Sequence, residues 1–387
     1  MTELLIGIMK RTLLFAAAIA MSVSTFAQFG GFGGFGQQGP QEPQTDLLDK
    51  AGFDTIINEK PVALYTIKKG DITAQITNWG GYVVSLMAPD KDGQCVNLIP
   101  HMSQVKRYLN ANCGQYGPAL GRFANRIANG TFSIDGIEYQ ITKNSGQHTL
   151  HGGKEGFDHT VWDVVKVTED ELVLKCVLPD GTDGFPGTLT TTLTYSITKD
   201  GGLSIHYEAT TDKKTVVNMS NHTYFNLNGA GNGDIMGHLL TINADKITET
   251  DRSNIPTGNY TDVEGTAYDF RQATKIGDRT AQGGGFGQQA QQDPMKVRNF
   301  DNNFVLNHNK AGKVEVVATL YSEESGRKME VLNDHPGLQV YTGARNAIAL
   351  ESQMFPDSPN HPEFPSTILE PGKTYTHTVI YRFSVVK

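Results

Sequence analysis

Alternation of hydrophobic and polar side chains is the dominant pattern of this chain. The segments 131–134 and 137–141 both alternate, and Asp135-Gly136 joins them. Both turn residues tolerate positive φ, so this stretch is predicted to be a β-hairpin. Period-two alternation in other places, with an Asp-Gly-Gly turn at 200–202, predicts further strands at 189–197, 203–207 and 375–386.

Helical periodicity is rare, so helices are expected to be few and short. From about residue 46 to residue 387 the pattern is all-β. Apart from a stretch near Gly284, no linker rich in Pro, Gly or Ser divides this region. We expect an all-β fold, one large antiparallel β-sandwich with few short helices, over 46–387. Two packed β domains are the alternative.

The amino terminus has the pattern of a signal peptide over 1–27. Lys10-Arg11 precede the apolar run 13–21, and Thr25-Phe26-Ala27 supplies a small residue at the cleavage position. The apolar run is too short for a permanent membrane span. We expect cleavage after Ala27 and export to the periplasm or medium, with no membrane attachment afterwards. An uncleaved anchor is the alternative, and translation starts at Met1 or Met9.

Two segments of low complexity have a similar composition, rich in Gly and Gln. Residues 28–45 are rich in Gly, Phe and Gln, contain too little apolar surface for a core, and are predicted to be a disordered leader. A similar run, Gly283-Gly284-Gly285-Phe286-Gly287-Gln288-Gln289, lies within 280–293 and is predicted to be a long surface loop.

Charge and cysteine content narrow the class of protein. The chain has 387 residues and a formal net charge of −8, which is not the basic footprint of a nucleic-acid-binding protein. The three cysteines, Cys95, Cys113 and Cys176, form no Cys-x-x-Cys pair, so a disulfide framework is not expected. One disulfide bridge plus one free thiol is the alternative. The sequence has no signal for oligomerisation, and a monomer is favoured.

Two separated segments carry candidate proton-transfer chemistry. His222 lies in a strand-like run beside Asn218, Asn221 and Asn226, which need hydrogen-bond partners and so favour a polar pocket over a dry core. Glu351 ends an apolar approach, and burial there would raise its pKa and make it a stronger base. An acid and a base together move protons on a neutral polar substrate. The alternatives are a core histidine and an exposed edge glutamate.

Three further motifs offer polar groups for a ligand. Arg126 beside Asn125 supplies a fork of donors for sugar-like oxygens, with a surface ion pair as the alternative. His148 and His151 lie three apart in a glycine-bounded loop, but no third ligand is near in sequence, so His151 is interpreted as a donor at a pocket rim rather than a metal ligand. Asp301 lies between aromatic residues and can hold two hydroxyls, or simply form a turn.

These segments, in this order, resemble the aldose 1-epimerases (galactose mutarotases) from about 66 to 383. The resemblance implies a large β-sandwich with an open sugar cleft on one sheet. It rests on Ala124-Asn125-Arg126-Ile127, Leu150-His151-Gly152-Gly153, Gly156-Phe157-Asp158, Asn221-His222-Thr223-Tyr224-Phe225-Asn226-Leu227, Ile255-Pro256-Thr257-Gly258, Gly265-Thr266-Ala267-Tyr268-Asp269-Phe270, Phe300-Asp301-Asn302-Asn303-Phe304, Gly337-Leu338-Gln339-Val340-Tyr341-Thr342-Gly343, Leu350-Glu351, Pro356-Asp357 and Pro362-Glu363-Phe364-Pro365.

The resemblance implies interconversion of the α and β anomers of free aldohexoses such as galactose and glucose. Glu351 would be the base at the anomeric hydroxyl and His222 the acid at the ring oxygen. Arg126, His151 and Asp301, helped by Asn125, would hold ring and hydroxyl oxygens. We expect the catalytic pair to flank a space the width of one pyranose, with pKa values set apart so that the base is ionised and the acid protonated. Proton transfer and positioning suffice, so neither a cofactor nor a metal is expected.

Two departures from the family pattern and two alternative functions accompany this interpretation. The Gly/Gln-rich insertion before Asp301 and the short stretch 343–350 both lie next to expected site residues.

A carbohydrate-binding protein that kept the cleft but lost turnover is one alternative function, and it is disfavoured because both Glu351 and His222 are present. An epimerase for phosphorylated or acidic sugars is the other. It would need more cationic residues than Arg126 and Arg345.

Overall fold

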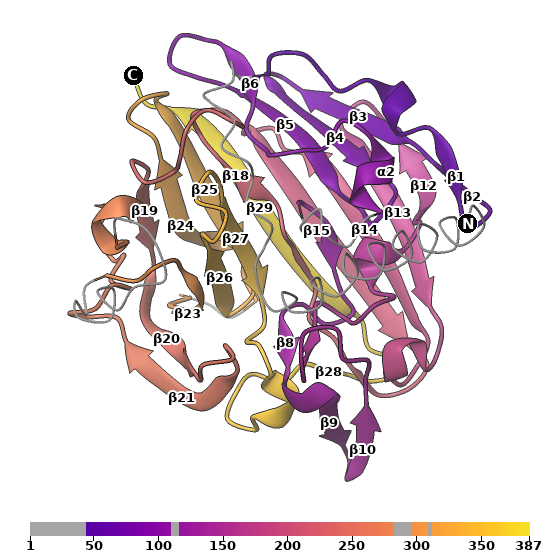
Figure 1. Cartoon of the computed structure of the whole chain (residues 1–387). Helices are drawn as coiled ribbons and strands as arrows, with labels where there is room; N and C mark the ends of the chain where they lie inside the picture. Colours follow the sequence, from indigo (N-terminus) through magenta and orange to yellow (C-terminus); the bar gives the residue numbers. More distant parts are fainter. Residues whose placement is uncertain (1–43, 110–115, 282–295, 309–311) are drawn as a thin grey trace, which may run out of the picture. The chain divides into compact units, whose positions relative to one another are not determined.

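The computed structural model describes residues 44–109, 116–281, 296–308 and 312–387. The largest sheet has nine antiparallel strands, which Figure 1 shows running across the molecule. Their order is β12 (Asp163–Val167), β13 (Glu171–Leu178), β14 (Leu189–Ile197), β15 (Gly202–Thr211), β29 (Tyr375–Val385), β25 (Arg327–Asn333), β24 (Glu315–Tyr321), β19 (Leu239–Ile242) and β22 (Thr274–Lys275).

A second layer consists of two smaller antiparallel sheets. The six-stranded sheet has the order β18 (Tyr224–Phe225), β27 (Ile348–Gln353), β26 (Gly337–Tyr341), β23 (Asp301–Leu306), β20 (Ala244–Thr250) and β21 (Pro256–Asp262). The four-stranded sheet has the order β3 (Leu64–Lys69), β4 (Ile72–Thr77), β5 (Val83–Pro89) and β6 (Cys95–Asn97).

Short two-stranded ladders complete the described fold. They pair β1 (Thr55–Ile57) with β2 (Lys60–Val62), β9 (Thr131–Ile134) with β10 (Ile137–Gln140), β8 (Arg126–Ile127) with β11 (Thr149–Leu150), β16 (Thr215–Val216) with β28 (Ile368–Leu369), and β7 (Ala119–Leu120) with β17 (Ser220–Asn221). The helical segments are α2 (Val105–Tyr108) and 3₁₀ turns at Lys50–Gly52, Ala128–Gly130, Phe157–His159, Thr182–Gly184, Ile276–Arg279 and Ser358–Asn360.

One hydrophobic core joins the two layers. Strand β14 alternates strictly between buried and half-buried residues, as the period-two pattern predicts for a strand with one face toward a core. Its buried Leu193 and Tyr195 belong to the same cluster as Ile76 of the four-stranded sheet and Leu350 of the six-stranded sheet. This cluster spans all three sheets, and the predicted large antiparallel β-sandwich is confirmed.

The predicted hairpin is also confirmed, and its turn has the expected geometry. Strands β9 and β10 pair antiparallel, and the two residues between them, Asp135 and Gly136, have φ of 52° and 80°. Positive φ at both positions is the signature of the turn that suits the twist of a two-residue hairpin.

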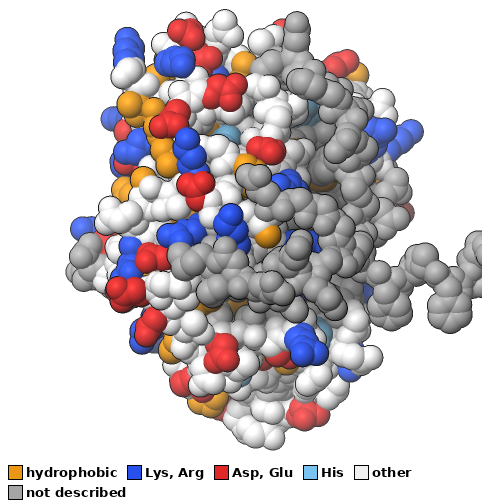
Figure 2. Space-filling model, turned by 60° about the vertical axis from the view of Figure 1, so that its left-hand side comes forward, with side chains coloured by type: hydrophobic (Ala, Val, Ile, Leu, Met, Phe, Trp, Pro, Cys, Tyr) orange, Lys and Arg blue, Asp and Glu red, His pale blue; other side chains and the backbone are white. Residues whose placement is uncertain are grey.

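Several sequence predictions fall on residues outside the described ranges. The signal peptide 1–27, most of the leader 28–45 and most of the loop 280–293 are among them, so they stay predictions. Cys95 and Cys176 are free thiols, whereas Cys113 lies outside the described part. Within the described ranges, every helix is too short or too polar to cross a bilayer. On the face shown in Figure 2, described Lys and Arg side chains lie among Asp and Glu side chains.

Candidate active site

Glu351 and His222 are brought together by a short strand pairing. Glu351 lies in β27, all of whose residues are buried, and His222 lies between β17 and β18. Strand β18 pairs with β27 through Tyr224 opposite Ala349, which places the preceding His222 beside Glu351. His222 Nε2 and Glu351 Oε1 are 3.6 Å apart. The predicted meeting of two distant side chains is therefore present in the structure.

The separation of the pair differs from our expectation. We expected the width of one pyranose between the two groups, and 3.6 Å is much narrower. The reason is chemical, because the anomeric oxygen and the ring oxygen are bonded to the same carbon and so are close neighbours. An acid and a base that serve these two oxygens can therefore lie side by side, with the sugar against the pair rather than between its members.

Burial sets the protonation of both groups. His222 is 6% and Glu351 2% exposed. Desolvation raises the pKa of Glu351 well above its usual value, with a further rise from Asp301 and an opposing effect from Arg126. Desolvation lowers the pKa of His222 to about 4. Since the raised pKa of Glu351 lies above the lowered pKa of His222, burial favours a proton on Glu351 rather than on His222, which is the reverse of the ionised base and protonated acid that we expected.

Two polar atoms of the pair have no hydrogen-bond partner among the described residues. They are Glu351 Oε2 and His222 Nδ1, and both are buried. Buried polar atoms in folded proteins are nearly always satisfied, so unpartnered ones in a site indicate groups that a ligand or water completes. Tyr224 stacks on the His222 ring with centroids 4.8 Å apart and restricts its orientation.

His151 is held as a neutral hydrogen-bond donor. Its backbone N–H donates to Asn125 O, and the Asn125 backbone N–H donates to His151 Nδ1 at 3.1 Å. Burial, with His222 and Arg126 nearby, lowers the pKa of His151 well below its usual value. A neutral ring that accepts at Nδ1 carries its proton on Nε2. His151, whose ring lies 5.5 Å from that of His222, therefore offers one N–H to a ligand oxygen.

Asp301 and Arg126 form the more exposed side of the site. Arg126 Nη2 lies 3.3 Å from Asp301 Oδ2, and the side chains are 17% and 20% exposed. Pairing of β8 with β11 joins Leu150 to Arg126 and so places His151 next to this ion pair. Asn125 Oδ1 accepts the backbone N–H of Arg126 at 2.9 Å. All six site residues predicted from the sequence thus lie in one region.

Two residues that hold Asp301 in place were not predicted from the sequence. Gln339 Nε2 donates to Asp301 Oδ1 at 2.7 Å, and Asn254 Nδ2 donates to Asp301 Oδ2 at 2.9 Å. Gln339 lies directly opposite Glu351 in the register of β26 with β27. The sequence did offer a signal for Gln339, because it is a polar residue in the mostly apolar Gly337–Gly343 motif and a buried polar side chain needs a hydrogen-bond partner. Asn254 has φ of 59° in a loop, and alternation patterns do not predict its contact.

A metal at this site is disfavoured by the tautomer of His151. Potential ligand atoms of His151, His222 and Glu351 lie within 4.8 Å of one another. The fold therefore brings together three possible metal ligands that are far apart in the sequence. However, His151 Nδ1 accepts a backbone N–H, which leaves the proton on Nε2, the nitrogen that would have to bind the ion. His148 accepts the backbone N–H of Asn129 instead. The arrangement suits a hydroxyl-rich ligand better than a cation.

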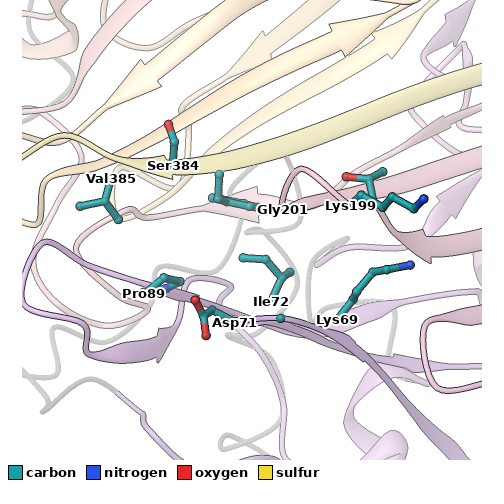
Figure 3. Close-up of a pocket in the computed structure, with 11 residues that line it drawn as sticks. Lys69, Asp71, Ile72, Pro89, Lys199, Gly201, Ser384 and Val385 are labelled. Atoms are coloured by element: carbon teal, nitrogen blue, oxygen red, sulfur yellow. The ribbon is translucent and has the colours of Figure 1, made fainter.

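A separate cavity of about 260 Å³ contains none of these residues. It lies between the β3–β4 turn, the β14–β15 turn and the end of β29 (Figure 3). Its lining includes Lys69, Asp71 and Lys199, with Ile72 and Phe383 as apolar neighbours. Lys69 already forms an ion pair with Asp170 at 2.5 Å. This cavity has no acid–base pair like that of Glu351 and His222.

Comparison with known proteins identifies relatives of this chain. The family model described as aldose 1-epimerase matches residues 63–382. Galactose mutarotase of Sus scrofa is 34% identical over 341 residues, which cover 84% of this chain and 94% of that protein. Aldose 1-epimerase of Escherichia coli K12 is 34% identical over 342 residues, which cover 84% of this chain and 96% of that protein.

Solved structures agree with the sequence relatives. An aldose epimerase homologue from C. elegans superposes with a TM-score of 0.75 at 28% identity, over 84% of this chain and all of that chain (100%). Galactose 1-epimerase from Lactobacillus acidophilus superposes with a TM-score of 0.73 at 25% identity, over 87% of this chain and 98% of that chain. The chain belongs to the aldose 1-epimerase family and is a carbohydrate epimerase.

Proposed function

We propose that this epimerase interconverts the α and β anomers of free aldohexoses such as galactose and glucose, with Glu351 and His222 as its acid–base pair. The main support is the 3.6 Å approach of the two side chains, each with a buried polar atom that lacks a partner among the described residues. Donors and acceptors for sugar hydroxyls surround this pair, namely Arg126, His151 and Asp301.

In the proposed reaction, Glu351 removes the proton of the anomeric hydroxyl while His222 protonates the ring oxygen. The C1–O5 bond breaks as the C1 carbonyl forms, so atoms and charge balance within the pair. The free aldehyde rotates about C1–C2 and recloses on its other face. In closure His222 removes the proton of the O5 hydroxyl and Glu351 returns a proton to O1, which restores the initial protonation state.

Positioning supplies the rest of the rate enhancement. His151 Nε2–H donates to one sugar oxygen, and Arg126 with Asn125 holds another. Asp301 accepts from hydroxyls, and its orientation is fixed by Gln339 and Asn254. Holding the ring against the pair makes proton transfer effectively intramolecular.

The proton shared by the pair governs the proposed pH dependence. The active form has one proton on the pair, and that proton passes from Glu351 to His222 when the sugar binds. Below about pH 4 His222 gains a second proton in the free enzyme, and Glu351 stays protonated, so no base remains. When pH exceeds the raised pKa of Glu351, the pair loses its last proton and no acid remains. We expect kcat/KM to be constant between these limits.

Removing the charge of Arg126 and removing that of Asp301 should move the alkaline limit of kcat/KM, which the pKa of Glu351 sets, in opposite directions. Arg126 lowers the pKa of Glu351 and Asp301 raises it. Arg126→Gln is therefore expected to shift the alkaline limit of kcat/KM to higher pH, and Asp301→Asn to lower pH, in addition to weaker sugar binding in both. Polarimetric rates across a pH series measure both limits. Shifts in the same direction would contradict the assignment of this limit to Glu351.

Polarimetry of freshly dissolved α-D-galactose tests the activity itself. The purified protein is expected to accelerate the approach to the equilibrium rotation above the spontaneous rate, in proportion to enzyme concentration. Parallel assays with glucose, xylose and arabinose rank the substrates. A sugar that binds, by calorimetry, without any acceleration would instead identify a carbohydrate-binding protein.

We further propose that the mature protein is exported. The support is the Lys10-Arg11 pair, the apolar run 13–21 and Ala27 at the cleavage position. Expression of the full chain in a Gram-negative host should yield a mature protein that begins at Gln28 and is found in the periplasmic fraction. N-terminal mass spectrometry measures this directly, and an intact amino terminus in the cytoplasmic fraction would exclude the proposal.

A further inference from the structure

Four tyrosines of the nine-stranded sheet direct their hydroxyl groups across the core. Tyr195 lies on β14, Tyr207 on β15, and Tyr375 and Tyr381 on β29. These three strands are neighbours in the sheet. Tyr195, Tyr207 and Tyr381 are fully buried, and Tyr375 is half-buried against the same core cluster. A buried hydroxyl needs a partner, and each of these bonds a residue that lies one to three positions before His222 or Glu351.

Three of the hydroxyls bond successive residues just before His222. Tyr375 Oη accepts the backbone N–H of Met219 at 3.0 Å. Tyr207 Oη donates to the backbone O of Ser220 at 2.6 Å. Tyr195 Oη donates to Gly81 O at 2.5 Å and accepts from Asn221 Nδ2 at 3.4 Å. The chain that leads into His222 is therefore fixed at three consecutive positions from one sheet.

The fourth hydroxyl bonds the residue before Glu351. Tyr381 Oη donates to Leu350 O at 2.8 Å. The Tyr381 ring also packs against Phe225 of β18, with centroids 4.7 Å apart, and β18 is the strand that pairs with β27. One sheet thus contacts the chain directly before each member of the catalytic pair.

A buried network orients one of these hydroxyls. Because Tyr375 Oη accepts from Met219 N–H, its own proton is directed to His335 Nε2, 2.9 Å away. His335 Nδ1 then carries the ring proton and faces Asp334 Oδ1 at 3.1 Å. Desolvation lowers the pKa of His335 to about 4, so the ring is neutral and accepts from Tyr375 at neutral pH.

The two strands on either side of His222 have little backbone pairing of their own, whereas β27, which carries Glu351, also pairs with β26 from Gly337 to Tyr341. Strand β17 pairs with β7 over two residues, and β18 pairs with β27 over two residues. By contrast, β15 pairs with β14 from Leu203 to Thr211 and with β29 along nearly the same length. We propose that Tyr195, Tyr207, Tyr375 and Tyr381 are positioning residues that hold His222 and Glu351 at their working separation. This inference rests on the proposed catalytic roles of the pair.

Tyrosine-to-phenylalanine variants test this proposal because they keep the ring and remove only the hydroxyl. For Tyr207→Phe and Tyr381→Phe we expect kcat to fall about tenfold each with KM nearly unchanged, since a displacement of about 1 Å can reduce a rate by about 100-fold. Tyr108→Phe is the matched control. Tyr108 is also buried, and its hydroxyl accepts the backbone N–H of Met102 at 2.8 Å, but it belongs to a different cluster.

All three variants are expected to lose thermal stability, because each loses one hydrogen bond between a tyrosine hydroxyl and the backbone. Only Tyr207→Phe and Tyr381→Phe should lose kcat. Equal kcat in those two variants and the unmodified protein would overturn the proposal, as would an equal loss of kcat in Tyr108→Phe.

A second measurement does not depend on activity. Nitrogen-15 NMR of labelled histidine rings, with His222 assigned through a His222→Asn variant, reports the ring environment directly. We expect the His222 ring signals to shift in Tyr207→Phe and to stay in place in Tyr108→Phe. Unchanged signals in Tyr207→Phe would refute the positioning role. A protein that shows these shifts but does not anomerise sugars would refute the proposed function instead.

Discussion

Replacing Glu351 with glutamine is expected to reduce kcat for anomerisation by about 1,000-fold, within the range of about 100- to 10,000-fold that general acid–base catalysis contributes. The amide has nearly the same shape as the carboxyl group, so sugar binding should persist and KM should change little. The initial rate of optical rotation in fresh α-D-galactose measures kcat, and calorimetry measures binding.

Stability separates loss of catalysis from loss of fold in this variant. Burial raises the pKa of Glu351 above that of the unfolded chain, so its contribution to stability is present at low pH and is lost as pH rises through the folded-state pKa. Glutamine stays neutral, so the variant should be at least as stable as the unmodified protein at alkaline pH. Glu208→Gln, at a side chain that is 57% exposed on β15, is the control and should keep full activity. Full activity in Glu351→Gln would refute the proposed base.

Replacing His222 with asparagine is the second change with a large expected effect. Asparagine keeps a polar side chain but cannot pass a proton to the ring oxygen, so kcat should again fall by about 100- to 1,000-fold. Polarimetric rates over a range of sugar concentrations separate kcat from KM.

The double variant Glu351→Gln/His222→Asn adds a test of cooperation between the two groups. Residues that act as a unit give strongly non-additive losses, so the double variant should be little slower than the slower single variant. Multiplicative losses would indicate that the two side chains act independently, against the proposed shared proton.

The fold was largely predictable from local patterns. The hairpin around Asp135-Gly136 and the strand 189–197 follow from alternation and turn chemistry, which act over a few residues. Strands of two residues, such as β17 and β18, leave too short a pattern to detect. These short strands flank His222, so the local geometry of the site was less predictable than the sandwich around it.

The site residues were predicted through their motifs, whereas their spacing and electrostatics were not. The order of the motifs that contain Arg126, His222 and Glu351 indicated one site, and the structure brings these residues together. The 3.6 Å separation and the support of Asp301 by Asn254 depend on tertiary packing. From the sequence we expected an ionised Glu351, but burial places the pKa of Glu351 above that of His222 and so reverses the favoured protonation of the pair.

A crystal structure of the Glu351→Gln variant with D-galactose would show whether the sugar contacts the two side chains as proposed. We expect the side chain at position 351 within about 3.2 Å of the anomeric oxygen and His222 Nε2 within about 3.2 Å of the ring oxygen, the reach of a catalytic hydrogen bond. Arg126, His151 and Asp301 should contact the other oxygens. A sugar bound elsewhere, or bound with its anomeric carbon turned away from His222, would refute the assignment of Glu351 and His222 as the acid–base pair.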